Sequence, residues 1–405
     1  MDKKLHNLIK REIKRQNDSI NLIASENYIS NEMLDVLGSP LTNKYSEGYP
    51  GKRYYPGNKF YDEIENLAKT RGLKSFKLSS NKWAINVQPY SGSPANFAIY
   101  SALMKPGDTL MGLNLSSGGH LTHGHKVNFS GKIYKAIQYG TDKNGYINYK
   151  EIEKLAKKYK PKVIVSGITA YPRKVNFKKF KKIAKSIGAY HVADISHIAG
   201  LVVAGLHESP FNYCDVVMMT THKTLRGPRG AIIFSKKELS KEIDKAVFPG
   251  TQGGPHNNTT AAKALMFFDI HKSSFKSYQK QVVKNSKALA KRLIKFGFNI
   301  VTGGTDNHLM LVDLKNIKIG GLEAEEILEK NNIIANRNSI HGDKSPFKPS
   351  GLRIGTPAIT TRGMKEKDMD RIAKLIYESL VIKRNIKKDI EKLTKKFPLT
   401  YDNRW

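Results

Sequence analysis

Residues 216–230 read VVMMTTHKTLRGPRG, an apolar run followed by a polar cluster and a glycine-rich turn. The run at 216–219 is too short for a helix and is bounded by polar residues, so it predicts a buried strand. Lys223 then lies at the carboxyl end of that strand, where open α/β sheets bind ligands. Most lysines at such places are solvated. The sequence neighbours of Lys223 are hydroxyl residues and the His222 imidazole, and the nearest acidic residue, Asp215, lies before the strand. These surroundings favour the neutral form of the amine, which is the form that makes a Schiff base.

Strand-like and helix-like segments alternate on both sides of this run. Strand composition is found at residues 109–113, 163–165, 191–193 and 231–234, and helical periodicity at residues 150–159 and 177–187. This alternation predicts a mostly parallel sheet with right-handed crossovers. Asp194 ends the strand at 191–193, so we expect its carboxylate at the same sheet edge as Lys223.

The chain is long enough for more than one domain. With 405 residues, of which 39% are hydrophobic, it can bury a large core and a smaller one. We expect an N-terminal helix or arm at residues 1–20, a large domain at 21–275 and a small C-terminal domain at 276–405. A long helical stretch at residues 259–295 is the expected bridge between the two domains.

Two segments before the predicted sheet have the composition of ligand-binding loops. Residues 42–57 contain four tyrosines, three glycines and two prolines, together with Glu47. This density of chain-breaking residues predicts an ordered loop with neither helix nor strand. Ser91, Gly92 and Ser93 precede a proline suited to the first turn of a helix. Free N–H groups at a helix start, with hydroxyls beside them, can bind phosphate.

Three histidines, His120, His123 and His125, lie within six positions. Closely spaced imidazoles are typical of zinc sites, so a metallohydrolase is one alternative. No cysteine or carboxylate nearby completes a set of four ligands, and glycines on both sides favour a backbone that lies against a flat ligand. We therefore expect no metal.

The cysteine content and the net charge bear on the cellular compartment and on the possible partners of the protein. Cys214 is the single cysteine, which excludes an intrachain disulfide and fits a reducing compartment. No segment has the pattern of a signal peptide or the length of a membrane span, so we expect a cytoplasmic protein without a membrane partner. The 69 Lys and Arg residues outnumber the 35 Asp and Glu, giving a formal net charge of +34. The lysines are spread over nearly every predicted helix, which favours compositional drift over a nucleic-acid surface, and a basic RNA-binding protein stays an alternative.

The candidate residues together match the chemistry of pyridoxal 5′-phosphate. Lys223 offers an amine for an imine, and Asp194 offers a carboxylate that keeps a pyridine nitrogen protonated. The hydroxyls of Ser91 and Ser93 suit the phosphate. Arg353, in a short strand pattern, can bind an amino-acid carboxylate through its guanidinium fork.

Four segments, in this order, resemble the serine hydroxymethyltransferase family: residues 45–55, 120–124, 220–230 and 345–361. The resemblance extends from near Asn21 to Thr361. It implies the aspartate-aminotransferase-like α/β fold, called fold type I, with a mostly parallel sheet in a large pyridoxal-phosphate domain and a smaller α+β C-terminal domain. It also implies transfer of the hydroxymethyl carbon of serine to tetrahydrofolate, which gives glycine and methylenetetrahydrofolate, in an obligate homodimer.

The resemblance carries roles over by position. Lys223 matches the Schiff-base lysine, Asp194 the partner of the pyridine nitrogen, and Glu47 the acid–base residue at the serine hydroxyl and folate. The implied catalytic residues are Lys223, Glu47, Asp194, His222 and Tyr55. The implied cofactor contacts are Ser91, Gly92, Ser93, His120, Thr169, Asp194, His197, Lys223 and Gly254. Among these, His120 is expected to stack on the cofactor ring. Gly254 belongs, with Gly253, to a loop that is expected to reach the cofactor phosphate of a neighbouring subunit. The implied substrate contacts are Ser25, Tyr45, Glu47, Tyr55 and Arg353 for serine, and Leu115, Gly119, His120, Leu121, Asn338, Ser345, Pro346 and Phe347 for folate.

Two features depart from the family pattern. Residues 74–85 are more polar than the corresponding segment, and Ser116 and Ser117 alter the edge of the expected folate loop. These departures bear on stability and folate affinity more than on the lysine chemistry. A folate-independent, threonine-type aldolase on the same fold is the nearest alternative, and an assay of serine with and without tetrahydrofolate separates the two.

Overall fold

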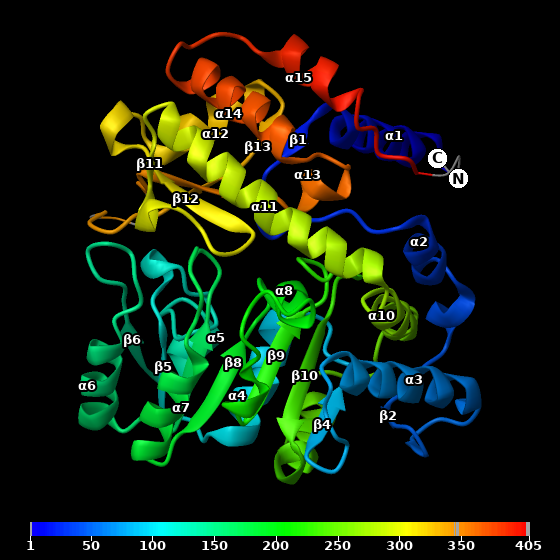
Figure 1. The fold of residues 1–405 in the computed structure, drawn as a ribbon. Helices are drawn as coiled ribbons and strands as arrows, with labels where there is room; N and C mark the ends of the chain where they lie inside the picture. The colour runs from blue at the N-terminus through cyan, green and yellow to red at the C-terminus, as the bar shows by residue number, and fades with distance from the viewer. Residues whose placement is uncertain (1, 344, 346–347, 402–405) are drawn as a thin grey trace.

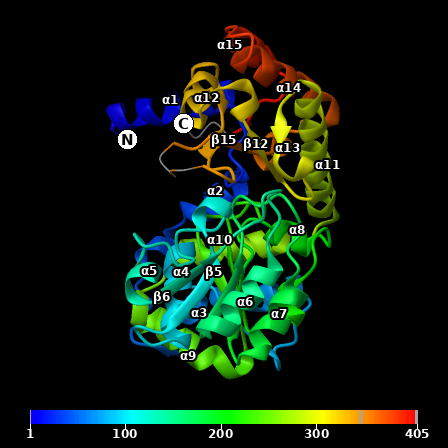
Figure 2. The same ribbon diagram turned by 90° about the vertical axis from the view of Figure 1, so that its left-hand side faces the viewer.

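The computed structural model describes residues 2–343, 345 and 348–401. A larger body is built around a seven-stranded sheet and a smaller one around a four-stranded sheet. Helix α11 (Ser273–Lys295) runs from one body to the other (Figures 1 and 2). Within these residues, no helix combines the length and the apolar character needed to cross a bilayer.

The larger sheet has the strand order β4-β10-β9-β8-β7-β5-β6. Strands β9, β8, β7, β5 and β6 are parallel to one another, whereas β10 is antiparallel to both β9 and β4. The predicted mostly parallel sheet is confirmed, with one reversed strand. The bounds are β4 (Trp83–Asn86), β5 (Thr109–Leu113), β6 (Lys135–Tyr139), β7 (Val163–Gly167), β8 (Tyr190–Asp194), β9 (Val216–Thr220) and β10 (Ala231–Lys236).

Side chains of β9 alternate between two buried faces of this sheet. Val216 and Met218 pack in the cluster with residues of α4 (Gly92–Leu103) and α9 (Ser240–Lys245). Val217 and Met219 pack in a second cluster on the opposite face. Because both faces are covered, the strand is a continuous apolar run and not an alternating one. The helices of that second cluster include α3 (Lys59–Ser75), α6 (Tyr149–Tyr159), α7 (Phe177–Ser186), α8 (Ala199–Val203) and α10 (Asn257–Asp269), and the short α5 (Phe129–Ile133) follows the histidine segment.

The smaller sheet is antiparallel, with the order β11-β12-β15-β14. Its core includes Ile20 and Leu22 from the start of the chain, because β1 (Ile20–Asn21) pairs with β13 (Ile333–Ile334). The predicted domain boundaries at residues 20 and 275 stay a prediction. The other elements here are β11 (Asn299–Ile300), β12 (Leu309–Asp313), β14 (Asn336–Asn338), β15 (Gly351–Gly355), α12 (Gly321–Lys330), α13 (Pro357–Thr361), α14 (Glu366–Leu380) and α15 (Lys387–Thr394).

The amphipathic N-terminal helix predicted from the sequence is α1 (Lys3–Asp18), which lies beside α15 (Figure 1). The buried guanidinium of Arg362 joins the two helices. It donates to the carbonyls of Gln16, Asn17 and Ser19 at the end of α1 and to those of Thr394 and Phe397 at the end of α15. A cation among the unpaired carbonyls of two helix ends satisfies acceptors that the helices leave free.

Two local predictions were wrong. The expected single helix at 259–295 is broken between α10 and α11, where the backbone of Lys272 is extended and a new helix begins at Ser273. The expected loop at 42–57 contains a small hairpin of β2 (Gly48–Tyr49) and β3 (Lys52–Arg53). Gly51, with a φ of +74°, allows the tight turn between them. Helix α2 (Asn31–Leu37) precedes this segment.

Candidate active site

Lys223 lies in the turn that follows β9, at the carboxyl edge of the larger sheet. Its Nζ donates to Thr220 Oγ1 at 2.7 Å, and its carbonyl accepts from Asn27 Nδ2 at 3.0 Å. Burial lowers the pKa of Lys223 to about 8, and the nearby positive charge of Arg353 acts in the same direction against the attraction of Asp194. A larger fraction of this amine is therefore neutral at neutral pH than of a solvated lysine.

Asp194 ends β8, the strand next to β9, and its carboxylate is almost fully buried. Oδ1 accepts from Ser196 Oγ at 2.6 Å, and Oδ2 accepts from Asn96 Nδ2 at 3.1 Å and contacts His123 Nε2 at 3.2 Å. Burial alone raises the pKa of a carboxyl group, but the hydrogen bonds and charges around Asp194 overcome this effect and lower its pKa. The group is thus kept as a carboxylate.

His123 reaches Asp194 because Gly167 has no side chain. A Cβ at Gly167 would lie 2.4 Å from His123 Cε1 and 2.9 Å from Asp194 Cβ. Nδ1 of His123 accepts the backbone N–H of His120 at 3.1 Å, so Nε2 carries the proton that is donated to Asp194. The sequence indicated His123 only as a possible zinc ligand, and among the described residues no group of three potential ligands is arranged to hold a metal.

The predicted phosphate cradle lies at the first turn of α4. Ser91 is the N-cap residue, and its side chain makes no capping hydrogen bond. A Cβ at Gly92 would lie 2.8 Å from Thr220 Cγ2, so this helix start packs directly against the end of β9. The cradle and the Lys223 turn are therefore neighbours, and the helix start offers its N–H groups to an anion.

Arg353 is the residue through which the smaller sheet contacts the site around Lys223. It lies on β15, and its guanidinium donates to the Thr169 carbonyl at 3.0 Å, to Asn336 Oδ1 at 3.1 Å and to Ser25 Oγ at 3.4 Å. Burial lowers its pKa to about 10, so it stays a cation at neutral pH. Thr169 also donates from Oγ1 to the Gly119 carbonyl at 2.9 Å, which links Arg353 to the histidine segment.

Four imidazoles around Lys223 are neutral at neutral pH. Burial lowers the pKa of His120 to about 4 and the pKa values of His222 and His308 to about 3, and it also lowers the pKa of His197 well below its ordinary value. His197 Nδ1 lies 3.2 Å from His308 Nε2. No role for His308 could be predicted from the sequence, because its partner His197 is 111 positions away in the chain.

Tyr45, Glu47, Tyr55 and Gly254 form a separate group. The rings of Tyr45 and Tyr55 are 5.1 Å apart, and the charge of Glu47 raises the pKa of Tyr45. A Cβ at Gly254 would lie 3.4 Å from Tyr45 Cε1. In the part of the chain that the structure describes, none of these side chains hydrogen-bonds Lys223, and Tyr45 and Tyr55 are exposed.

The model of the family described as serine hydroxymethyltransferase matches residues 1–376. The chain belongs to the serine hydroxymethyltransferase family. It therefore has the pyridoxal-phosphate fold of type I and is a pyridoxal-phosphate-dependent transferase of hydroxymethyl groups, with tetrahydrofolate as co-substrate. Its reaction interconverts serine and tetrahydrofolate with glycine and methylenetetrahydrofolate.

The residues present fit the cofactor of this family. Lys223 offers an amine of lowered pKa, Asp194 a permanent carboxylate, and the start of α4 an anion site next to both. The Nδ1 atom of His222, next to Lys223 in the chain, is buried and has no hydrogen-bond partner among the described residues. A polar atom left in this state indicates a position that a polar ligand atom can satisfy.

The residues expected to contact folate in a serine hydroxymethyltransferase are spread over two segments. Leu115 begins a single 3-10 turn, Gly118 follows with a φ of +92°, and Leu121 is exposed. Asn338 ends β14 and donates to the Ser339 carbonyl at 2.8 Å. Ser345 has no regular structure, and Pro346 and Phe347 lie outside the described residues.

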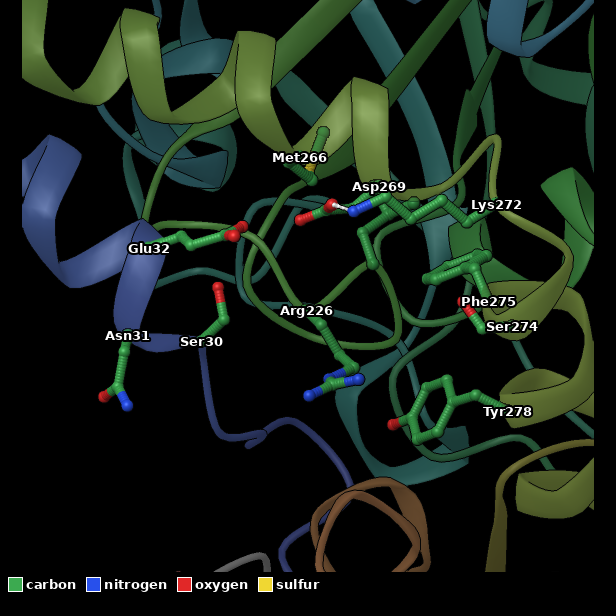
Figure 3. A pocket seen from close by; sticks show the side chains of 11 residues that line it. Ser30, Asn31, Glu32, Arg226, Met266, Asp269, Lys272, Ser274, Phe275 and Tyr278 are labelled. Atoms are coloured by element: carbon green, nitrogen blue, oxygen red, sulfur yellow. Dashed lines mark hydrogen bonds and ion pairs between the residues drawn. The ribbon is translucent and has the colours of Figure 1, made fainter. Parts of the chain in front are cut away.

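Two hollows adjoin the Lys223 turn. One, of about 600 Å³, is lined in part by Ser25, His222 and Arg229. The other, of about 470 Å³, lies between α2 and the start of α11 (Figure 3). There the Arg226 guanidinium lies over the Tyr278 ring at 4.9 Å, and Asn27 Nδ2 donates both to the Tyr278 hydroxyl and to the Lys223 carbonyl. Of the predicted site residues that the structure describes, none lines this second hollow, which instead borders the residues that hold the Lys223 turn.

Proposed function

We propose that the hydroxymethyl transfer takes place between Lys223 and Asp194, with Lys223 as the residue that binds pyridoxal phosphate covalently. The observation that carries this proposal is the placement of a lysine of lowered pKa and a buried carboxylate at the carboxyl ends of the adjacent parallel strands β9 and β8. Arg353 lies near enough to influence the pKa of Lys223. The start of α4 packs directly against the end of β9, because a Cβ at Gly92 would lie 2.8 Å from Thr220 Cγ2.

Pyridoxal phosphate, when bound, supplies an aldehyde that captures the substrate amine and a ring that accepts electrons from the breaking bond. Asp194 has the role of holding a proton on the pyridine nitrogen of the ring, since its lowered pKa keeps it a carboxylate. His120 has the role of covering one face of the ring as a neutral imidazole, and the first turn of α4 that of binding the phosphate. Thr169 and His197 are proposed as further contacts of the cofactor.

The carboxylate of serine is assigned to Arg353 and Ser25. The Arg353 fork already donates to Ser25 Oγ at 3.4 Å, a long contact that a substrate carboxylate can replace with a shorter, charge-assisted bond. Arg353 remains charged in its buried position, which gives it the ability to select the anionic end of the amino acid. His222 is proposed to contact the cofactor through its unpartnered Nδ1.

Glu47 is assigned to proton transfer at the serine hydroxyl while the bond between Cα and Cβ of serine breaks. Glu47 and Tyr45 lie against Gly253 and Gly254, and a Cβ at Gly253 would lie 3.1 Å from Glu47 Oε1. We propose that this whole group, with Tyr55, completes the site of a second subunit, so that the active form is a homodimer. A cytoplasmic location is part of the same proposal.

A Lys223→Ala variant tests the assignment. It should keep the circular dichroism of the folded protein, lose turnover of serine with tetrahydrofolate, and bind pyridoxal phosphate without a covalent bond. Multiple turnovers by this variant would contradict the role of Lys223. Omission of tetrahydrofolate should also abolish the reaction of serine in the unaltered protein, and equal rates without folate would favour an aldolase.

A further inference from the structure

Lys263 is a fully buried lysine that the reaction does not account for. It lies on α10, only 1% of its surface is exposed, and none of the described acidic side chains forms an ion pair with it. Its Nζ donates to three backbone carbonyls, those of Val87 at 2.5 Å, Ala231 at 3.0 Å and Pro89 at 3.1 Å. Three acceptors match the three N–H donors of an ammonium group.

These carbonyls belong to the two chain segments that carry the cofactor residues. Pro89 is two residues before Ser91, the N-cap of α4. Ala231 begins β10 and follows Gly230, whose carbonyl accepts the N–H of Thr221 at 3.0 Å, two residues before Lys223. One side-chain nitrogen therefore contacts both the segment that leads to the phosphate cradle and the segment that follows the Lys223 turn.

The approach of Lys263 to this place depends on Gly230. A Cβ at Gly230 would lie 2.6 Å from Lys263 Cε and 3.3 Å from Thr221 Oγ1. The segment before the cradle is also held by Gln252, whose amide donates to the Gln88 carbonyl at 3.0 Å and whose Oε1 accepts from the Tyr90 N–H at 3.3 Å. The Ala231 N–H also donates to the Pro89 carbonyl at 3.2 Å, so Lys263 reinforces a backbone link between this segment and the strand that follows the Lys223 turn.

We propose that Lys263 is a positioning residue for pyridoxal phosphate, which fixes the distance between the phosphate cradle and Lys223. The cofactor is held at two points, by a covalent bond at one end and by an anion site at the other. A rigid spacing lets both be satisfied together, whereas a loose spacing makes the phosphate contribute less to affinity. This inference rests on the proposed function, because it uses the cradle at Ser91 and Ser93.

The test compares the affinities of cofactor-free protein for pyridoxal phosphate and for pyridoxal, measured by absorbance titration. The ratio of the two dissociation constants is the phosphate advantage. In Lys263→Met, which keeps the length of the side chain but has no donors, the phosphate advantage should fall by at least about tenfold. Phe267→Leu is the matched control, since Phe267 is a fully buried residue one turn further along α10. It should weaken the core and leave the advantage unchanged.

Gly230→Ala provides a second and independent variant, because it crowds Lys263 Cε and leaves the lysine in place. It should also lower the phosphate advantage. If Lys263→Met does not fold, Gly230→Ala still tests the role of Lys263. An advantage that stays as large as in the unaltered protein would overturn the inference. The double variant Ser91→Ala/Ser93→Ala distinguishes a failure of the proposed function from a failure of the role of Lys263. If the double variant keeps the phosphate advantage, the phosphate cradle is assigned wrongly. If the double variant loses the advantage and the Lys263 and Gly230 variants keep it, only the role of Lys263 is wrong.

Discussion

His123 Nε2 lies 3.2 Å from Asp194 Oδ2, and the other nitrogen of the same ring accepts the backbone N–H of His120. The backbone of one segment thereby sets the tautomer of His123, and that tautomer donates to the carboxylate. Hydrogen bonding to a carboxylate stabilises its charged form. His123 is therefore one reason why the buried Asp194 stays ionised.

A His123→Leu variant should move the acid limb of the pH profile. Without the donor, the pKa of Asp194 rises, so the carboxyl group takes up its proton at a higher pH and activity is lost earlier as the pH falls. The measurement is kcat/KM for serine as a function of pH. His125→Leu is the control, since His125 lies in the same segment without contacting Asp194. Superimposable acid limbs for both variants and the unaltered protein would refute the coupling.

The lowered pKa of Lys223 should govern the uptake of the cofactor by cofactor-free protein. The amine reacts with an aldehyde only when it is neutral, so the rate should rise as the pH approaches about 8 and level off above it. A solvated lysine would give a rate that keeps rising to about pH 10. Stopped-flow absorbance at a series of pH values distinguishes the two curves. A rate that still climbs steadily well above the pKa of about 8 would mean that burial does not activate this amine.

Replacement of Arg353 by Lys should impair serine binding although the charge is kept. Lysine cannot form the two parallel hydrogen bonds of the guanidinium fork, and it loses the bonds to Thr169 and Asn336. The KM for serine should rise by about 10- to 100-fold. Asn336→Ala, which removes one support of the fork and leaves the fork itself, should have a smaller effect. An unchanged KM in Arg353→Lys would exclude Arg353 as the carboxylate site.

Arg362 should matter for stability and not for chemistry. Arg362→Met leaves the carbonyls at the ends of α1 and α15 without their shared donor and should lower the free energy of unfolding by about 2 to 4 kcal/mol. Urea denaturation measures this loss. Arg371→Met on α14 is the control, because Arg371 forms an exposed ion pair with Asp389 and should have little effect. Equal losses in the two variants would contradict the role of Arg362.

Mixed dimers test whether Glu47 acts across the subunit interface. A Glu47→Gln protein and a Lys223→Ala protein are each expected to be inactive. When the two are unfolded together and refolded, a dimer with one chain of each kind has one site with both defects and one site with neither. Activity should then return to about a quarter of that of the unaltered protein, as random pairing of a two-fold dimer requires. No recovery would place Glu47 in the same subunit as the lysine that it serves.

The sequence predicted the sheet and its edge because the physical signals there are local. β9 is buried on both faces, so residues 216–219 form one unbroken apolar run. Asp194 ends the neighbouring strand, and Lys223 lies three residues after the end of β9. The hairpin at β2 and β3 and the break before α11 were missed, because two-residue strands and a three-residue interruption hardly change the composition of a window.

The contacts that tune the site could not be read from the sequence. His123 and Asp194 are 71 positions apart, and Asn96 and Asp194 are 98 positions apart. Lys263 lies in a helix whose pattern gives no sign that a charged residue faces the core. In each of these cases the tertiary packing decides which residues come into contact, and the periodicity of the sequence does not reveal such long-range contacts.

Chemical trapping of the cofactor tests the central assignment most directly. The protein is incubated with pyridoxal phosphate, reduced with borohydride to make the bond to the lysine permanent, and digested for peptide mass mapping. We predict a stoichiometric label on Lys223 and none on the exposed lysines once excess cofactor is removed before reduction. A label at any other lysine in place of Lys223, or no label at all, would contradict the account.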